Sequence, residues 1–247
     1  MLLLFAVTLF LGALALFWVQ PLVGKMLLPV LGGTPAVWNT CMLFFQGMLL
    51  AGYAYALLSV RWLGARRQAA LHLALLVLAA LSLPISIAEI DSAAVPVGDP
   101  TAWVLWRLLK TVGLPFFVLS AGAPLLQKWF SVTRHPSAGD PYFLYAASNA
   151  GSLVALVAFP LLLEPHLRLR EQNQLWSIAY FSLIALTLAC AAFVWRSRLS
   201  GTTESEAVSE SEGQTDEPGG ENLPAVAAAE RSGRLSLRRR LWWAALA

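Results

Sequence analysis

Charged residues are scarce in this chain. Asp, Glu, Lys and Arg make up only 13% of its 247 residues, whereas hydrophobic residues make up 58%. A water-soluble domain typically carries about 25% charged residues, and the mean hydropathy here is +0.65. The composition therefore excludes an ordinary soluble globular domain and predicts a membrane protein.

Cysteine and histidine are also few, with two and three copies respectively. Cys41 and Cys190 each lie inside an apolar run, with no second cysteine or histidine at the spacing of metal ligands. We expect neither a disulfide framework nor a zinc site. Both cysteines are interpreted as small hydrophobic residues buried in the apolar part of the protein.

Motifs for catalysis and nucleotide binding are missing. The sequence has no Walker motif, no G-x-G-x-x-G loop and no G-x-S-x-G elbow. We predict no catalytic residue, no metal and no cofactor in this chain, because no acid, base and nucleophile are placed as a set. A sequence pI near 9.1 could indicate nucleic acid. The basic residues flank apolar segments instead, so no nucleic-acid partner is predicted.

Six segments are long and apolar enough to cross the hydrocarbon core of a bilayer, which requires about 20 helical residues. A seventh apolar run starts near residue 237 and stops at residue 247, so we expect a truncated chain or a fragment. The predicted fold is all-α, a polytopic bundle of six transmembrane helices with the start of a seventh. The predicted spans are Leu2–Leu22, Ala36–Val60, Gln68–Ala88, Leu108–Phe130, Tyr142–Leu163 and Leu175–Trp195.

The domain organisation follows from a change in composition after the sixth span. Residues 200–233 are rich in Ser, Thr, Glu, Gly and Pro and contain no aromatic residue. Such a segment cannot bury enough apolar surface to offset its ordering entropy. We therefore expect a six-helix domain over residues 1–196, a disordered cytoplasmic linker over 197–236 and the start of a further span over 237–247.

The acidic and basic residues predict how the chain is oriented. Eight of the fourteen acidic residues fall in the linker and the other six are assigned to loops, so no carboxylate is expected inside a span. With a cytoplasmic N-terminus, the short inner loops hold five basic residues and the outer loops hold three. This excess favours a cytoplasmic N-terminus.

The stretch "VQPLVGKMLLPVLGG" at residues 19–33 places two prolines and a lysine after an apolar run. Proline frees a backbone carbonyl that lipid cannot satisfy, so a broken helix must be packed in protein or line a wet cavity. Lys25 either extends to the lipid headgroups or faces such a cavity. "PLVGK" at Pro21 is echoed by "PLLQK" at Pro124, which would fit an inverted-topology repeat or arise by chance.

Polar side chains within the spans are candidates for a solute site, because an amide is costly in lipid unless it hydrogen-bonds or contacts a solute. Tyr142, Tyr145 and Asn149 follow one stripe of a helix, beside Ser148. Contacts between packed helices would produce the same pattern. The predicted substrate-binding set is Gln20, Lys25, Asn39, Gln46, Tyr145 and Asn149.

Several ordered blocks of sequence carry a family resemblance. "QPLVGKMLLPVLGGTPAVWNTCMLFFQGMLLAGYAYA", "GLPFFVLSAGAPLLQKWFS", "DPYFLYAASNAGSLVAL" and "FPLLLEP" resemble the membrane part of bacterial multipass spermidine synthase-like proteins. These are described as a major-facilitator-like membrane region fused to a spermidine synthase-like domain. The resemblance covers residues 2–195. It implies half of a major-facilitator-like fold in a bacterial inner membrane.

The resemblance also implies a link to polyamines for a longer parent protein. Its aminopropyltransferase-like domain is not among these residues, so the resemblance supplies no catalytic residue here. We expect a membrane domain that binds or transports a small solute related to polyamines. The expected partners are the lipid bilayer, a small cationic solute, and a second membrane half or another copy of the chain. The alternative is a membrane anchor for the soluble domain. The lack of carboxylates in the predicted spans argues against tight binding of a polyamine cation.

Overall fold

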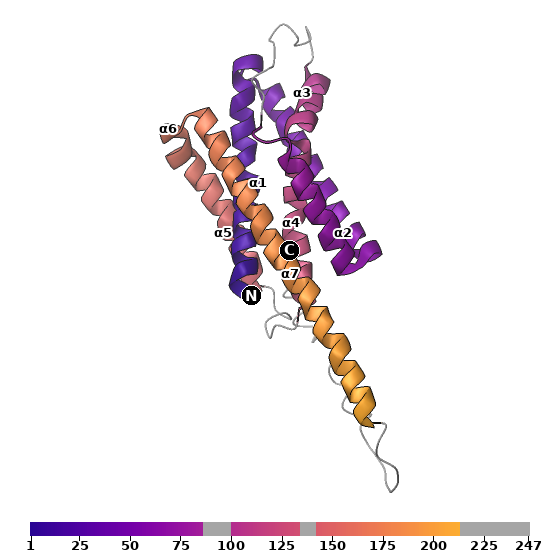
Figure 1. Ribbon diagram of the computed structural model, residues 1–247. Helices are drawn as coiled ribbons and strands as arrows, with labels where there is room; N and C mark the ends of the chain where they lie inside the picture. Colours follow the sequence, from indigo (N-terminus) through magenta and orange to yellow (C-terminus); the bar gives the residue numbers. More distant parts are fainter. Residues whose placement is uncertain (86–99, 134–141, 213–247) are drawn as a thin grey trace, which may run out of the picture. The chain divides into compact units, whose positions relative to one another are not determined.

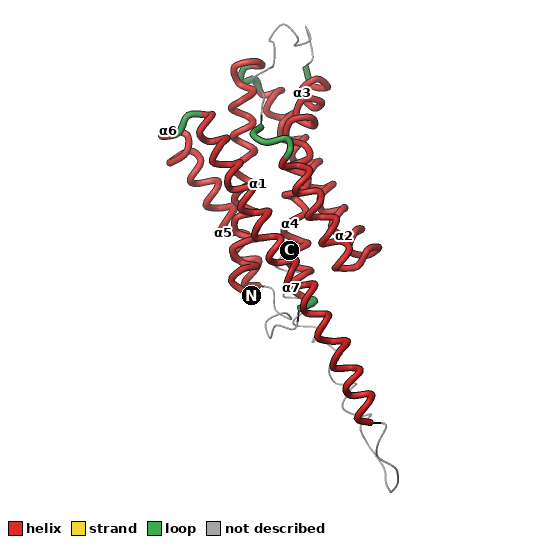
Figure 2. Tube along the Cα trace, in the orientation of Figure 1, coloured by secondary structure: helices red, strands yellow, loops and turns green. Residues whose placement is uncertain are grey.

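The computed structural model describes residues 1–85, 100–133 and 142–212, with side chains described as far as residue 196. The chain forms two compact units, residues 1–203 and residues 204–247. Every regular element in the described ranges is a helix (Figure 2). The all-α prediction is confirmed for this part of the chain.

Helices account for most of the described residues (Figure 1). Two of them, η2 and η4, are π-helical turns that continue directly into the next α-helix. The elements are α1 (Leu2–Leu31), α2 (Pro35–Ala80), α3 (Thr101–Leu108), η2 (Leu109–Gly113), α4 (Leu114–Ser131), α5 (Tyr142–Ala158), η4 (Phe159–Leu163), α6 (Glu164–His166) and α7 (Leu169–Glu212).

Five helical segments in the described residues are long and apolar enough to cross a membrane. The prediction of a multipass membrane protein agrees with this finding. The sequence predicted six spans, and the count differs because two of them fall within the single segment α2. The predicted seventh span lies outside the described residues. The five segments are Leu2–Leu31, Pro35–Ala80, Thr101–Ser131, Tyr142–His166 and Leu169–Arg196.

α7 extends to Glu212 and so enters the stretch predicted to be a linker. The rest of that predicted linker lies outside the described residues.

α1 passes through both prolines that predicted a broken helix. Pro21 and Pro29 lie inside α1, which ends only at Gly32, where φ is 71°. The prediction that the first span ends at Leu22 is therefore wrong. A proline removes one backbone hydrogen bond, but helices in a bundle tolerate this loss where neighbouring helices pack around it. Leu22 and Val23 are fully buried beside Pro21.

α2 begins with a well-formed cap. The Thr34 hydroxyl accepts a hydrogen bond from the Val37 N–H at 3.4 Å, and Pro35 occupies the first helical turn. Both features are typical of helix N-termini. The start of α2 lies against α1, because a Cβ built on Gly24 would lie 3.1 Å from the Trp38 ring.

α2 folds back on itself at Gly64. The backbone there has φ 68° and ψ 166°, a conformation that is essentially restricted to glycine. A straight helix would place Tyr55 and His72 about 25 Å apart at 1.5 Å per residue. Their ring centroids are 6.2 Å apart. α2 is therefore a hairpin, with a first arm of residues 35–63 and a second arm of residues 65–80.

Extensive contacts join two helix pairs of the bundle, α1 with α5 and α2 with α4. Each pair depends on a glycine at its crossing point. A Cβ on Gly151 of α5 would overlap the carbonyl oxygen of Phe10 in α1. A Cβ on Gly52 of α2 would overlap the Ser120 hydroxyl of α4. Small residues of this kind let membrane helices approach closely.

Candidate functional site

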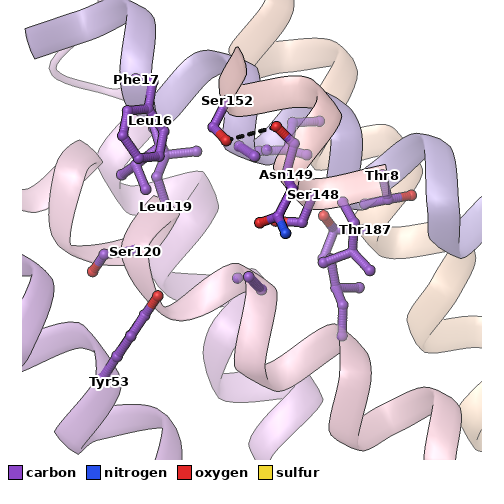
Figure 3. A pocket seen from close by; sticks show the side chains of 17 residues that line it. Thr8, Leu16, Phe17, Tyr53, Leu119, Ser120, Ser148, Asn149, Ser152 and Thr187 are labelled. Atoms are coloured by element: carbon purple, nitrogen blue, oxygen red, sulfur yellow. Dashed lines mark hydrogen bonds between the residues drawn. The ribbon is translucent and has the colours of Figure 1, made fainter. Parts of the chain in front are cut away.

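A cavity of about 200 Å³ is lined by residues of α1, α2, α4, α5 and α7. Small residues such as Gly12 and Gly122 contribute to its wall. It is smaller than the roughly 300–1,000 Å³ typical of sites for drug-sized ligands, so it fits a smaller molecule. Its polar lining residues are Thr8, Tyr53, Ser120, Ser148, Asn149, Ser152 and Thr187 (Figure 3).

The polar groups of this cavity are all uncharged. Each is a hydroxyl or an amide, and no Lys, Arg, Asp or Glu from the described part of the chain lines the cavity. These residues also contain no group of three or more His, Cys, Asp or Glu that could hold a metal ion. The site can offer hydrogen bonds to a solute, but it cannot neutralise a full charge.

Three of the six hydroxyls that line the cavity donate to the backbone. Ser152 donates to the carbonyl of Asn149 at 2.8 Å (Figure 3), Ser120 to that of Phe117 at 2.7 Å, and Thr8 to that of Leu4 at 2.7 Å. A hydroxyl that donates in this way keeps acceptor capacity on its oxygen. These groups are therefore acceptors toward the cavity.

The Asn149 amide differs from the hydroxyls. Its side chain has no hydrogen bond to another residue in the ranges that the structure describes. A free carboxamide offers two N–H donors and one acceptor oxygen. Asn149 can thus donate hydrogen bonds to a solute, while the hydroxyls of Thr8, Ser120 and Ser152 accept.

The six residues predicted from sequence do not converge on one site. Of these six, only Asn149 lines the cavity as the structure describes it. Tyr145, one turn earlier on α5, is 52% exposed. Asn39 and Gln46 are exposed on the first arm of α2. Gln20 is half-buried, and its amide donates to the Leu16 carbonyl at 3.4 Å within α1.

Sequence reasoning missed most of the hydroxyl residues of the cavity, including Thr8, Tyr53 and Ser120. A Ser or Thr hydroxyl in a helix can bond the carbonyl one turn back, so its presence in an apolar run is unremarkable. A usable signal was the four-residue spacing of Thr8 from Gly12 and of Ser148 from Ser152. Such spacing places hydroxyl and small residues on one helix face.

Lys25 pairs with a carboxylate and is not a lining residue of this cavity. Its Nζ lies 2.6 Å from Oε1 of Glu164 and 6.0 Å from the centroid of the Phe159 ring. The two charged side chains are 30% and 46% exposed. The pair connects α1 to α6 and supplies Lys25 with a counter-charge.

The positions of two acidic residues contradict the prediction that no acidic residue falls inside a span. Glu164 lies within the candidate span Tyr142–His166, and Glu171 lies within Leu169–Arg196. The prediction was wrong because the helix continues past Leu163 through the π-helical turn η4 into α6, and because α7 begins at Leu169 instead of Leu175. Both acids lie near the ends of their segments, where contact with water is still possible.

Reversing either charge of the pair is expected to destabilise the protein modestly. In Lys25→Glu or Glu164→Lys, two like charges face each other, and the free energy of unfolding should fall by up to about 1 kcal/mol because both groups are partly exposed. The double reversal should recover most of this loss. Denaturation of the purified chain in detergent measures all three variants. If the effects of the two reversals add instead of cancelling, the two residues do not interact.

The chain matches no family model, no curated protein and no solved structure.

Proposed function

We propose that this chain is a six-pass inner-membrane domain that binds a small, uncharged, polar solute in the cavity around Asn149. The observation that carries the proposal is the uncharged polar lining of that cavity, contributed by five helices whose other lining residues are apolar. Polar groups within a membrane-spanning helix are costly unless they have a function or a partner. A hydrogen-bonding solute supplies that partner.

The fold-back at Gly64 supports six passes. Each of the two antiparallel arms of α2 crosses the membrane once, so α2 supplies two of the six passes. The contact pattern supports an inverted repeat in which α1 and the two arms of α2 correspond to α4, α5 and α7. In this correspondence α1 matches α4, and the first arm of α2 matches α5. The contact between α1 and α5 therefore matches the contact between α4 and α2, as an inverted-topology repeat requires.

Two tryptophan hydrogen bonds join helix pairs that match in the same correspondence, although the donor lies on α4 in one pair and on α7 in the other. Trp129 of α4 donates to Gln68 of the second arm of α2 at 2.7 Å. Trp176 of α7 donates to the Ala15 carbonyl of α1 at 2.9 Å. The pairing of α4 with the second arm thus corresponds to the pairing of α1 with α7. This agreement supports a repeat that the short sequence echo only suggested.

Charged and aromatic residues support the proposed orientation. Arg61, Arg66 and Arg67 surround the reversal at Gly64, which favours a cytoplasmic position. In α3 and η2, Arg107 lies 5.8 Å from the centroid of the Trp103 ring and Lys110 lies 4.7 Å from that of Trp106. Aromatic residues with nearby cations are typical of a membrane interface. The bacterial inner membrane itself comes from the family resemblance.

The lining favours a neutral solute over a polyamine. A polyamine cation would require carboxylates, and none lines the cavity in the described residues. Glu164 is not a lining residue and already pairs with Lys25. The polyamine link implied by the resemblance would then belong to the soluble part of a longer parent protein.

A thermal-shift experiment tests the proposal with erythritol as an uncharged probe and putrescine as a cationic probe. A ligand that binds only the folded state raises the melting temperature. Erythritol should stabilise the wild type more than Asn149→Leu, and putrescine should not distinguish them. Asn39→Leu, which removes an exposed amide away from the cavity, should behave like the wild type. The comparison between variants cancels the general effect of a polyol on stability.

The same experiment separates the proposed function from the alternative. If erythritol stabilises the wild type and Asn149→Leu equally, the Asn149 amide binds no such solute. The membrane-anchor role would then be the better account of this domain. If putrescine alone discriminates between the two proteins, the site binds a cation and the argument from its uncharged lining is wrong.

A further inference from the structure

A second polar cluster lies between the two arms of α2 and α4, and none of its residues lines the Asn149 cavity. Tyr55 and Ser59 come from the first arm of α2, Gln68 and His72 from the second arm, and Trp129 from α4. Gln68 and Trp129 are fully buried, and His72 is 2% exposed. The cluster therefore lies in the interior of the bundle.

The aromatic rings hold this cluster in a fixed arrangement. The Trp129 indole N–H donates to Oε1 of Gln68 at 2.7 Å. The His72 ring stacks on Tyr55 with centroids 6.2 Å apart and meets the Trp129 ring edge-on at 6.0 Å. Gln68 and His72 are four residues apart on one helical arm, so they share a face. The amide and the imidazole thus point into the same region.

Three buried polar atoms of this cluster have no hydrogen-bond partner in the described part of the chain. They are Nε2 of Gln68, Nδ1 of His72 and the hydroxyl oxygen of Tyr55. The Tyr55 hydroxyl lies near the side chains of Gln68 and Ser59, but without the geometry of a direct hydrogen bond. A buried donor or acceptor that stays unpaired is strongly unfavourable. Three such atoms in one place indicate a missing partner.

We propose that a single water molecule occupies this cluster. It accepts a hydrogen bond from the Gln68 amide N–H and another from the Tyr55 hydroxyl, and it donates to Nδ1 of His72. A buried water typically forms about three hydrogen bonds, which matches the three unpaired atoms. The cluster offers no charged group, and the Gln68 N–H would repel a cation.

The water adds a hydrogen-bonded link between the two arms of the hairpin to the direct stacking of His72 on Tyr55. It joins the first arm, through Tyr55, to the second arm, through Gln68 and His72. Gln68 extends the connection to α4 through Trp129. The reversal at Gly64 and the packing of α2 on α4 are therefore stabilised by one shared hydrogen-bond network.

The variants His72→Phe and Tyr55→Phe test the proposal through the sign of their effect. Each keeps an aromatic ring; Tyr55→Phe removes the hydroxyl, and His72→Phe removes Nδ1 together with the second ring nitrogen. If water bridges the cluster, each variant loses a hydrogen bond, and the melting temperature should fall by about 2–4 °C. If no water is bound, each variant removes an unpaired polar atom, so its stability should stay the same or rise. A melting temperature at or above that of the wild type overturns the proposal.

Two further measurements complete the test. Because both residues bind the same water, the double variant should lose little more than the larger single variant; strictly additive losses contradict a shared molecule. Tyr180→Phe, which removes a direct hydrogen bond to the Leu76 carbonyl at 3.2 Å, calibrates the size of one lost bond. If a variant does not fold, a high-resolution density map of the wild-type chain shows whether the water is present. Density within hydrogen-bond distance of both Gln68 and His72 supports the water, and a filled apolar contact there overturns it.

Discussion

Replacing Gly151 with alanine is expected to lower the free energy of unfolding by about 3 kcal/mol, at the upper end of the usual cost of overpacking. The added Cβ would overlap the carbonyl oxygen of Phe10, and the carbonyl carbon of the same residue lies only 2.9 Å from that position. Backbone atoms of α1 cannot rotate away as the end of a side chain can. The crossing of α1 and α5 must therefore open. Chemical denaturation in detergent measures the loss.

Gly47→Ala is the matched control, because it places the same methyl group on a helix where nothing lies within 4 Å. Alanine is a better helix former than glycine by about 1 kcal/mol. The control should therefore be neutral or stabilising, so the two substitutions should have opposite signs. Equal effects at the two positions would mean that α1 and α5 do not approach closely at Gly151.

Trp176→Ala is expected to cost about 3–5 kcal/mol. Trp176 is fully buried, its indole N–H donates to the Ala15 carbonyl at 2.9 Å, and its ring lies 5.6 Å from that of Tyr180. Truncation leaves a large cavity between α7 and α1 and removes the hydrogen bond. In a membrane the loss comes mainly from packing, because lipid is as apolar as the interior of the bundle. The free energy of unfolding again provides the measurement.

Trp62→Ala provides the comparison, since Trp62 is 76% exposed near the reversal of α2. Removing this side chain should change the stability by less than about 1 kcal/mol. If the two variants lose the same free energy of unfolding, the burial of the Trp176 ring between α7 and α1 does not set the size of its loss.

The helical, membrane-spanning character of the chain could be predicted because it depends on local composition. Long apolar runs require helices in lipid wherever they occur in a fold. The ends of the helices were harder to predict. Pro21 suggested an end to α1, yet neighbouring helices support that region and the helix continues to Leu31. The reversal at Gly64 was expected only as a loop between two separate spans.

The site could be predicted only in part, because a sequence does not reveal which way a polar side chain faces. Asn39 and Asn149 both looked like costly amides in apolar helices. Both side chains are exposed, but the structure places Asn149 at the wall of the cavity and Asn39 away from it on α2. That difference depends on how helices distant in sequence pack together. The sequence did not indicate that the hydroxyls of Thr8 and Ser120 line the cavity, since each donates a hydrogen bond to the backbone of its own helix.

The proposed function requires that Asn149 face a polar cavity that a solute can reach from water. The direct measurement is labelling of Asn149→Cys by a membrane-impermeant thiol reagent, in a background where Cys41→Ala and Cys190→Ser remove the native thiols. Val154→Cys is the control, because Val154 is exposed on a different face of α5, where lipid would suppress formation of the reactive thiolate. We predict rapid modification at position 149 and little at position 154. Modification at position 149 that is no faster than at position 154 would contradict the account.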